Sequence, residues 1–274
     1  MTISYNSPPT VDLCHLGGAP NSLAFICVPH AGGSIAVFRS WPKLLPYVDF
    51  YALSLPGRDA RFDQRPFTNL YSLVASAVDA MFHLTRRPFA LFGHSMGALI
   101  VFEIARLLRR KNAAAPAQLF ISGFRAPHLP DLKSPRFDLP DERFIEELKR
   151  MNSPGCDSTA HSELLGLMLP TLRADFYLIE TYRYDPEPSL ACPITVYGGS
   201  YDAEVSEQQL REWRQHTSAN FAMIMLPGGH FFPQTHTQVL LHEIDRQLSE
   251  QVTSRGHARK VDASSITKFP HATE

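Results

Sequence analysis

The sequence carries no excess of charge of one sign. Its 274 residues include 26 Lys and Arg and 27 Asp and Glu, which gives a formal net charge of -1. No long run of like charges stands out. A nucleic-acid-binding surface is commonly basic, as a patch or a stripe. We therefore expect no nucleic-acid partner.

Long apolar stretches and closely spaced cysteines are also lacking. Nowhere do roughly 18 consecutive apolar residues suggest a membrane span, and the first ten residues do not resemble a secretory signal. The cysteines form no CxxC pair; they are Cys14, Cys27, Cys156 and Cys192. These absences predict a cytoplasmic protein with reduced thiols, no membrane partner, no metal and no cofactor.

Short apolar runs alternate along the chain with segments of helical periodicity. Strands that are buried on both faces of a parallel sheet have this uniformly apolar character. We expect helices over 70–84, 98–110 and 238–248, and strands over 23–28, 50–53, 89–92, 119–122, 194–197 and 221–226. The alternation predicts an α/β fold with a mostly parallel central sheet flanked by helices.

One domain over residues 1–253 accounts for this alternation. Before the strand at 194–197 lies a segment with helical patterns and no strand, which we interpret as a helical cap inserted at about 127–188. It should contain a helix over 141–150 and one or two helices over 164–182, interrupted near Pro170 because proline breaks helix interiors. Residues 254–274 are polar and aperiodic, and we expect a disordered tail.

Gly93-His94-Ser95-Met96-Gly97 matches the G-x-S-x-G motif. An apolar strand precedes it and an Ala- and Leu-rich helix follows, as in the nucleophile elbow of the α/β-hydrolase fold. The glycines leave room for a strained turn that lifts the serine hydroxyl above the sheet. A glycine-rich turn with a capping serine is the alternative. We predict that Ser95 is a catalytic nucleophile.

A serine nucleophile needs a base, and the base needs an acid that orients it. In this fold the acid follows a later strand and the histidine follows the last strand. Asp202 and His230 occupy those two places. Glu204 on the same loop is the rival acid, and Asp185 fits less well because it precedes its strand. We predict a triad of Ser95, Asp202 and His230.

Acyl transfer also needs hydrogen-bond donors for the oxyanion. The backbone N–H of Met96, directly after the nucleophile, should be one of them. The second should come from the glycine-rich loop at 28–34, where we assign the N–H of Ala31, with a neighbouring amide as the alternative.

Several motifs together resemble the type II, or editing, thioesterases of nonribosomal peptide synthetase and polyketide synthase systems. The resemblance spans about 23–248 and rests on Pro29-His30-Ala31-Gly32-Gly33-Ser34, Leu55-Pro56-Gly57-Arg58, Phe92-Gly93-His94-Ser95-Met96-Gly97, Leu169-Pro170-Thr171-Leu172-Arg173-Ala174-Asp175, Cys192-Pro193-Ile194 and Pro227-Gly228-Gly229-His230-Phe231-Phe232. By resemblance, the catalytic roles carry over to Ser95, Asp202 and His230.

The resemblance implies a thioesterase of secondary metabolism, including antibiotic biosynthesis. It would hydrolyse acyl thioesters from the phosphopantetheine arms of carrier proteins and so clear stalled or mis-primed groups. Its partners would be acyl-phosphopantetheinyl carrier proteins, bound transiently by a monomer. No carrier or condensation domain accompanies the sequence, which agrees with the separate editing type.

Apolar cap residues and a basic loop are less specific. The cap residues Leu164, Leu165, Met168, Leu172 and Phe176 could wall an acyl chamber or simply pack the cap onto the core. From these we take Leu172 and Phe176, with Phe231 beside His230, as candidate chamber residues. The basic loop contains Arg58, Arg61 and Arg65. We interpret it as a solvated loop face rather than as a contact for a phosphate or an acidic carrier.

Three other functions are alternatives to a thioesterase. A carboxylesterase or lipase would need the same triad, and an acyltransferase would pass the acyl group to an amine or alcohol instead of water. A binding protein on a hydrolase scaffold usually lacks a triad member, whereas all three are present here.

Overall fold

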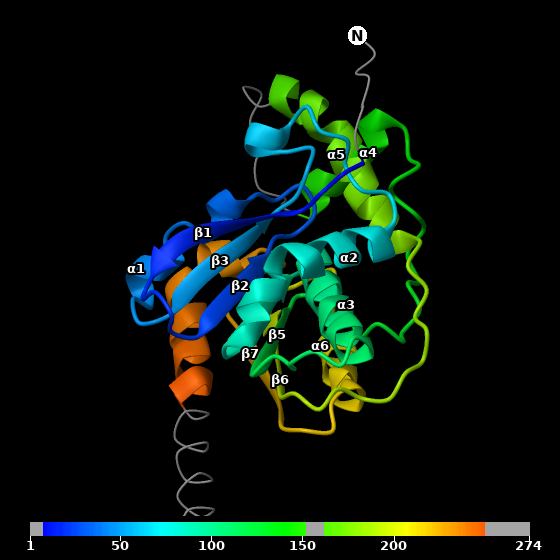
Figure 1. The fold of residues 1–274 in the computed structure, drawn as a ribbon. Helices are drawn as coiled ribbons and strands as arrows, with labels where there is room; N and C mark the ends of the chain where they lie inside the picture. The colour runs from blue at the N-terminus through cyan, green and yellow to red at the C-terminus, as the bar shows by residue number, and fades with distance from the viewer. Residues whose placement is uncertain (1–7, 152–161, 250–274) are drawn as a thin grey trace, which may run out of the picture.

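The computed structural model describes residues 8–151 and 162–249, so the expected tail at 254–274 lies outside the described residues. Seven strands form one sheet in the order β1-β3-β2-β4-β5-β6-β7 (Figure 1). Only the β1–β3 pair is antiparallel. The strands are β1 (Asp12–Gly18), β2 (Ala24–Val28), β3 (Asp49–Ser54), β4 (Phe89–His94), β5 (Gln118–Ser122), β6 (Ile194–Gly199) and β7 (Phe221–Leu226).

Alternate side chains of the central strands enter two different apolar layers. In β2, Ile26 packs into the layer beneath α2 and α3, whereas Phe25 packs into the layer on the opposite face. In β4, Leu91 and Phe92 divide in the same way. Because successive residues of a strand point to opposite faces, a sheet covered on both sides requires apolar residues at every position. This explains the uniformly apolar runs in the sequence.

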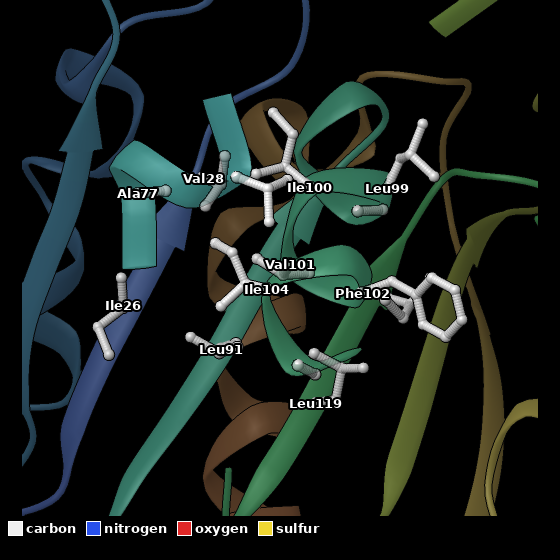
Figure 2. Packing of buried hydrophobic residues seen from close by; sticks show 14 of the residues in the cluster. Ile26, Val28, Ala77, Leu91, Leu99, Ile100, Val101, Phe102, Ile104 and Leu119 are labelled. Atoms are coloured by element: carbon white, nitrogen blue, oxygen red, sulfur yellow. The ribbon is translucent and has the colours of Figure 1, made fainter. Parts of the chain in front are cut away.

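Helices cover both faces of the sheet, and the described helices are α1 (Trp41–Leu44), α2 (Leu70–Met81), α3 (Met96–Arg110), α4 (Asp141–Arg150), α5 (Ser162–Glu180), α6 (Glu207–Arg211), α7 (Phe232–Thr235) and one over 237–249. Figure 2 shows how α3 presents Ile100, Val101 and Ile104 to the sheet. The opposite face is covered by α1 and the helix over 237–249. The predicted helices therefore exist, although α2 ends in a 3₁₀ turn over Phe82–Arg86.

Strand β1 was not among the strands expected from the sequence. It is an edge strand with half-exposed residues, and a bulge between His15 and Gly17 interrupts its pairing with β3. Gly17 and Gly18 both have positive φ angles. A bulged, glycine-containing edge strand lacks the regular apolar alternation by which strands are recognised.

The cap is helical, as expected, and lies at one end of the sheet (Figure 1). The expected interruption near Pro170 is wrong, because α5 continues through this proline. Leu169 and Leu172 are buried on either side of it, in a cluster with Phe144 and Leu148 of α4. Packing of this apolar face offsets the hydrogen bond that the proline removes.

Within the described ranges, no helix combines the length and the apolar character needed to cross a membrane.

Candidate active site

Ser95 occupies a sharp turn between β4 and α3. Its backbone has φ 53° and ψ −117°, a strained conformation for a residue with a Cβ. A Cβ on Gly93 would lie 2.1 Å from the carbonyl oxygen of Gly97, and one on Gly97 would lie 2.2 Å from that of Val28. The Ser95 N–H donates to Ser122 O of β5 at 2.8 Å. The two glycines are thus required by close backbone contacts on either side of the serine.

Ser95, His230 and Asp202 are joined in one hydrogen-bonded chain. The Ser95 Oγ lies 3.1 Å from His230 Nε2, and His230 Nδ1 lies 2.9 Å from Asp202 Oδ2. The loops after β6 and β7 bring the acid and the histidine to the carboxyl edge of the sheet, where the turn after β4 presents the serine. In the tautomer with its proton on Nδ1, the imidazole donates to the carboxylate, and Nε2 can accept the serine proton.

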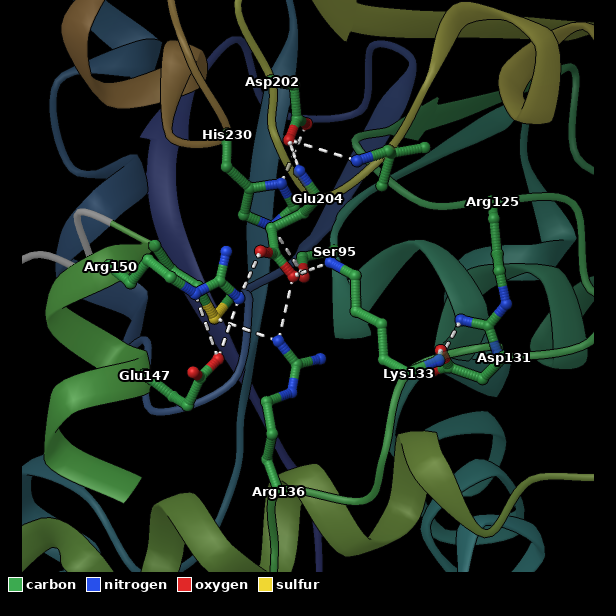
Figure 3. Close-up of polar contacts among 12 residues, drawn as sticks. Ser95, Arg125, Asp131, Lys133, Arg136, Glu147, Arg150, Asp202, Glu204 and His230 are labelled. Carbon is green, nitrogen blue, oxygen red and sulfur yellow. Dashed lines mark hydrogen bonds and ion pairs between the residues drawn. The ribbon is translucent and has the colours of Figure 1, made fainter. Parts of the chain in front are cut away.

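The two rival acids of this loop have separate partners. Asp202 bonds to His230, and its other oxygen accepts the N–H groups of Glu204 and Val205. The Glu204 carboxylate turns instead toward the cap, where it contacts Lys133, Arg136 and Arg150 at 2.6, 2.9 and 3.3 Å (Figure 3). We call these four residues the outer cluster. Glu204 therefore does not contact the histidine.

The electrostatics of the outer cluster favour an ionised Glu204. Burial raises its pKa, but the hydrogen bond from Lys133 and the charge of Arg136 outweigh burial and lower the pKa to about 2.

Met96 and Ala31, the two predicted oxyanion donors, both lie beside Ser95. Met96 is the first residue of α3, directly after the serine, and Ala31 lines the same cavity as Ser95. Two neighbouring amides of the loop are engaged, since Gly32 N–H donates to Asp175 and Gly33 N–H donates to His30 O. Because both glycine amides already have acceptors, Ala31 stays our candidate for the second donor.

A cavity opens beside Ser95 between the sheet edge and the cap, with an empty volume of about 790 Å³ that includes solvent at its mouth. Phe176 and Phe231, two of the three expected chamber residues, line it. Leu172 is not among its lining residues, because it packs in the cap cluster and against Gly32. Charged residues also line the cavity; they are Arg125, Asp131, Lys133, Arg136 and Glu204.

Two further histidines surround the base. The rings of His94 and His230 lie 5.1 Å apart, and those of His30 and His94 lie 5.9 Å apart. Burial, reinforced by the nearby His230, lowers the pKa of His30 to about 3 and that of His94 well below its usual value. His94 Nδ1 contacts the carbonyl and hydroxyl of Ser122 rather than the serine of the turn. Both neighbours stay neutral beside the base.

Arg58 is buried, contrary to the solvated loop expected from the sequence. Its guanidinium forms two 2.9 Å bonds with the two oxygens of Asp175 in α5 and donates a third to Gly33 O at 3.1 Å. The same Asp175 accepts Gly32 N–H at 2.7 Å. We call Arg58, Asp175, Gly32 and Gly33 the inner cluster. It joins three of the motifs that carried the family resemblance.

Arg61 is buried as well, and it bonds to Ser54 O and Thr10 O, whereas Arg65 is exposed. The expectation of a solvated face therefore holds for Arg65 alone. The burial of the other two follows from backbone carbonyls and a distant aspartate, which a turn sequence does not reveal.

The sequence missed most of the polar cavity wall. Arg125 follows β5, and Lys133 and Arg136 lie in an irregular stretch that has no periodicity of its own. Their location after strand β5 was the one sequence feature that could have indicated a role in the cavity wall, because loops after the carboxyl ends of parallel strands commonly line the ligand site. Within the described ranges, no group of three or more His, Cys, Asp or Glu is arranged to hold a metal ion.

Comparison with known proteins identifies a family that this chain matches over most of its length. Residues 24–248 match the model of the thioesterase domain. The chain is 40% identical over 211 residues to the gramicidin S biosynthesis protein GrsT of Aneurinibacillus migulanus, covering 77% of this chain and 82% of that protein.

Similar solved structures are also thioesterases. RedJ, a thioesterase from the prodiginine biosynthetic pathway of Streptomyces coelicolor, superposes with a TM-score of 0.78 at 33% identity, covering 89% of this chain and 90% of RedJ. YbtT, a type II thioesterase from the yersiniabactin NRPS/PKS pathway, gives a TM-score of 0.78 at 33% identity and covers 87% and 98%. A Ser→Ala mutant of YbtT is also among the similar structures.

Proposed function

Because this chain belongs to the thioesterase family, we propose that it hydrolyses acyl thioesters from the phosphopantetheine arms of carrier proteins and so clears stalled or mis-primed groups. The observation that carries the proposal is the chain of hydrogen bonds from Ser95 through His230 to Asp202, at the wall of a cavity beneath the cap. The relatives named above support the assembly-line setting.

In the first half-reaction, Ser95 Oγ attacks the thioester carbonyl carbon and transfers its proton to His230 Nε2. Asp202 orients the imidazole and stabilises its positive charge. The carbonyl oxygen becomes an oxyanion, which accepts hydrogen bonds from Met96 N–H and Ala31 N–H. The C–S bond then breaks, the thiolate takes the proton from His230, and an acyl ester remains on Ser95.

In the second half-reaction, water replaces the thiol. His230 takes a proton from the water while the hydroxide oxygen attacks the acyl carbon, and the ester C–O bond breaks as the proton returns to Ser95 Oγ. The neutral states of His30 and His94 serve this cycle, because neither adds a positive charge that would oppose protonation of His230.

The partners that follow from this function are carrier proteins, each bound transiently through its acylated arm. We further propose a monomer in the cytoplasm that needs no cofactor. Burial of Cys27 and Cys192 as free thiols supports a reducing compartment.

Replacement of the nucleophile tests the assigned chemistry. Ser95→Ala should fold normally and lose turnover by on the order of ten-thousandfold or more, because the other triad members act only through the serine. Turnover of an acyl thioester and circular dichroism of the same sample measure both properties. Near-normal turnover by the folded variant would exclude this site.

The substrate class needs a separate experiment, because the triad treats thioesters and oxygen esters alike. Contacts with the carrier, remote from the reacting carbon, should raise kcat/KM for an acetyl or propionyl group on the holo carrier above that for the same group on coenzyme A. A nitrophenyl acetate assay completes the comparison. Equal efficiency on all three substrates would reject the editing function and favour a general esterase.

A further inference from the structure

We propose that Arg58 and Asp175 are positioning residues that hold the second oxyanion donor in place, so that one residue of the cap helix α5 supports the oxyanion hole. The inference rests on the proposed serine-hydrolase function and concerns two residues that touch neither the triad nor the reacting atoms. Four contacts within the inner cluster carry it.

The first step concerns the loop itself. Ala31 precedes two glycines, and Gly32 has φ +71°, a conformation that residues with a Cβ rarely adopt. One internal bond, from Gly33 N–H to His30 O, closes the turn, but a loop with two glycines still has several accessible conformations. Further contacts are therefore needed to fix the direction of the Ala31 N–H. The inner cluster supplies one on each glycine, from Gly32 N–H to Asp175 and from Arg58 to Gly33 O.

The second step concerns the strength of these contacts. The side chains of Arg58 and Asp175 are only 3% and 2% exposed, and their two parallel bonds fix the carboxylate in one orientation. A carboxylate held in this way cannot rotate to follow the loop, so the Gly32 amide must follow the carboxylate.

The third step is the direct packing of α5 on the loop. A Cβ added to Gly32 would lie 2.4 Å from Leu172 Cδ2, so the side chain of α5 occupies the space that any other residue would need. Helix α5 thus contacts this loop through Leu172 as well as through Asp175.

A rigid donor stabilises the transition state without reorganising, which is the main benefit of an oxyanion hole. Loosening the loop should therefore lower kcat and leave KM nearly unchanged, since the donor acts on the oxyanion more than on the bound thioester. We expect Asp175→Asn to lower kcat by on the order of 10- to 100-fold, less than complete removal of a donor would.

A structural role alone would also lower activity through unfolding, so the key variant removes both charges. Arg58→Met combined with Asp175→Leu leaves no unpaired buried charge, and such replacements commonly preserve stability. It still deprives Gly32 N–H of its acceptor. Thr171→Val is the matched control, because it removes a buried hydrogen bond of the same helix without touching the Ala31–Gly33 loop.

The measurements use a small activated ester and a trifluoromethyl ketone, which forms a tetrahedral oxyanion with the serine. We expect the double variant to lose kcat and affinity for the ketone by the same factor, and Thr171→Val to keep both. Ketone affinity that stays at the wild-type value, or an equal loss of kcat in Thr171→Val, would overturn the proposal. Failure of the serine-hydrolase assignment is distinguishable, because wild-type turnover would then survive Ser95→Ala.

Discussion

The cap is attached to the core through two ionic clusters that are built in different ways. The inner cluster has one cation and one carboxylate, both almost completely buried and joined by two parallel bonds. The outer cluster gathers three cations around Glu204, and two of them, Lys133 and Arg150, are 37% and 50% exposed. The difference indicates a fixed contact at one end of the cap and an adjustable one at the other.

This difference indicates that the two helices of the cap differ in how firmly they are held on the core. Although Arg136 and Glu204 are only 12% and 7% exposed, the start of the cap and α4 also contact the core loop through the exposed cations Lys133 and Arg150. We therefore expect this side to open for an acylated arm. The central part of α5 cannot move without disturbing the loop of Ala31. We therefore expect the largest motion of the cap in α4 rather than in α5.

The largest expected effect is on kcat, and it distinguishes Asp202 from Glu204 of the outer cluster. Asp202→Asn should lower kcat by on the order of ten-thousandfold, as in other triads, because the wrong histidine tautomer results. Glu204→Gln, an equivalent change two residues away, should lower kcat less than tenfold, because Glu204 contacts only the cap. Steady-state kinetics on one thioester compares them. The reverse order would make Glu204 the catalytic acid.

The next effect concerns stability. Arg58→Ala leaves the Asp175 carboxylate buried without its partner and should reduce the free energy of unfolding by about 3–5 kcal/mol. Arg150→Ala, in the outer cluster, should cost at most about 1 kcal/mol because its guanidinium is half-exposed. Urea unfolding followed by circular dichroism gives both values. Similar losses in the two variants would remove the distinction between the clusters.

Salt should separate the clusters without any mutation. In 1 M salt the screening length falls to about 3 Å, so the exposed ion pairs of the outer cluster weaken while the buried pair is little affected. We expect amide exchange in α4 to accelerate by roughly fivefold, equivalent to about 1 kcal/mol, with no change around Asp175. A uniform response of α4 and α5 would contradict the contrast.

The last expected effect concerns the pH dependence of stability. The pKa of Glu204 is lowered in the folded state to about 2 from an ordinary value of 4.5. Its contribution should therefore be fully present above about pH 4.5 and disappear as the pH falls toward 2, because the unfolded chain binds the proton more readily in between. Unfolding of the wild type and Glu204→Gln at pH 5, 4 and 3 should show a shrinking difference. A constant difference would be inconsistent with this coupling.

The placement of Ser95, His230 and Asp202 at one edge of the sheet could be predicted because each residue has a local signal. Ser95 lies in a motif flanked by a strand and a helix, and His230 and Asp202 follow apolar runs at the places that this fold assigns to them. The choice of Asp202 over Glu204 was harder, since both lie on one loop. It depends on which carboxylate caps the loop amides and which meets Arg136, and only the folded chain shows this.

The inner cluster had no such signal. Arg58 and Asp175 lie 117 positions apart, one in a turn and the other in a helix, and each residue type is usually exposed. The family motifs that contain them were apparent as a resemblance without a physical reason. The structure supplies the reason, because the arginine of one motif neutralises the aspartate of another beneath the glycines of a third.

The strained turn at Ser95 also sets catalytic activity against thermal stability. A non-glycine residue held at φ 53° and ψ −117° costs of order 1–3 kcal/mol. Ser95→Gly should relieve part of that strain, so the inactive protein should melt at a higher temperature than the active one, whereas Ser95→Ala should not gain in this way. Selection for stability alone would thus remove the nucleophile, and selection for turnover must retain a residue that weakens the fold.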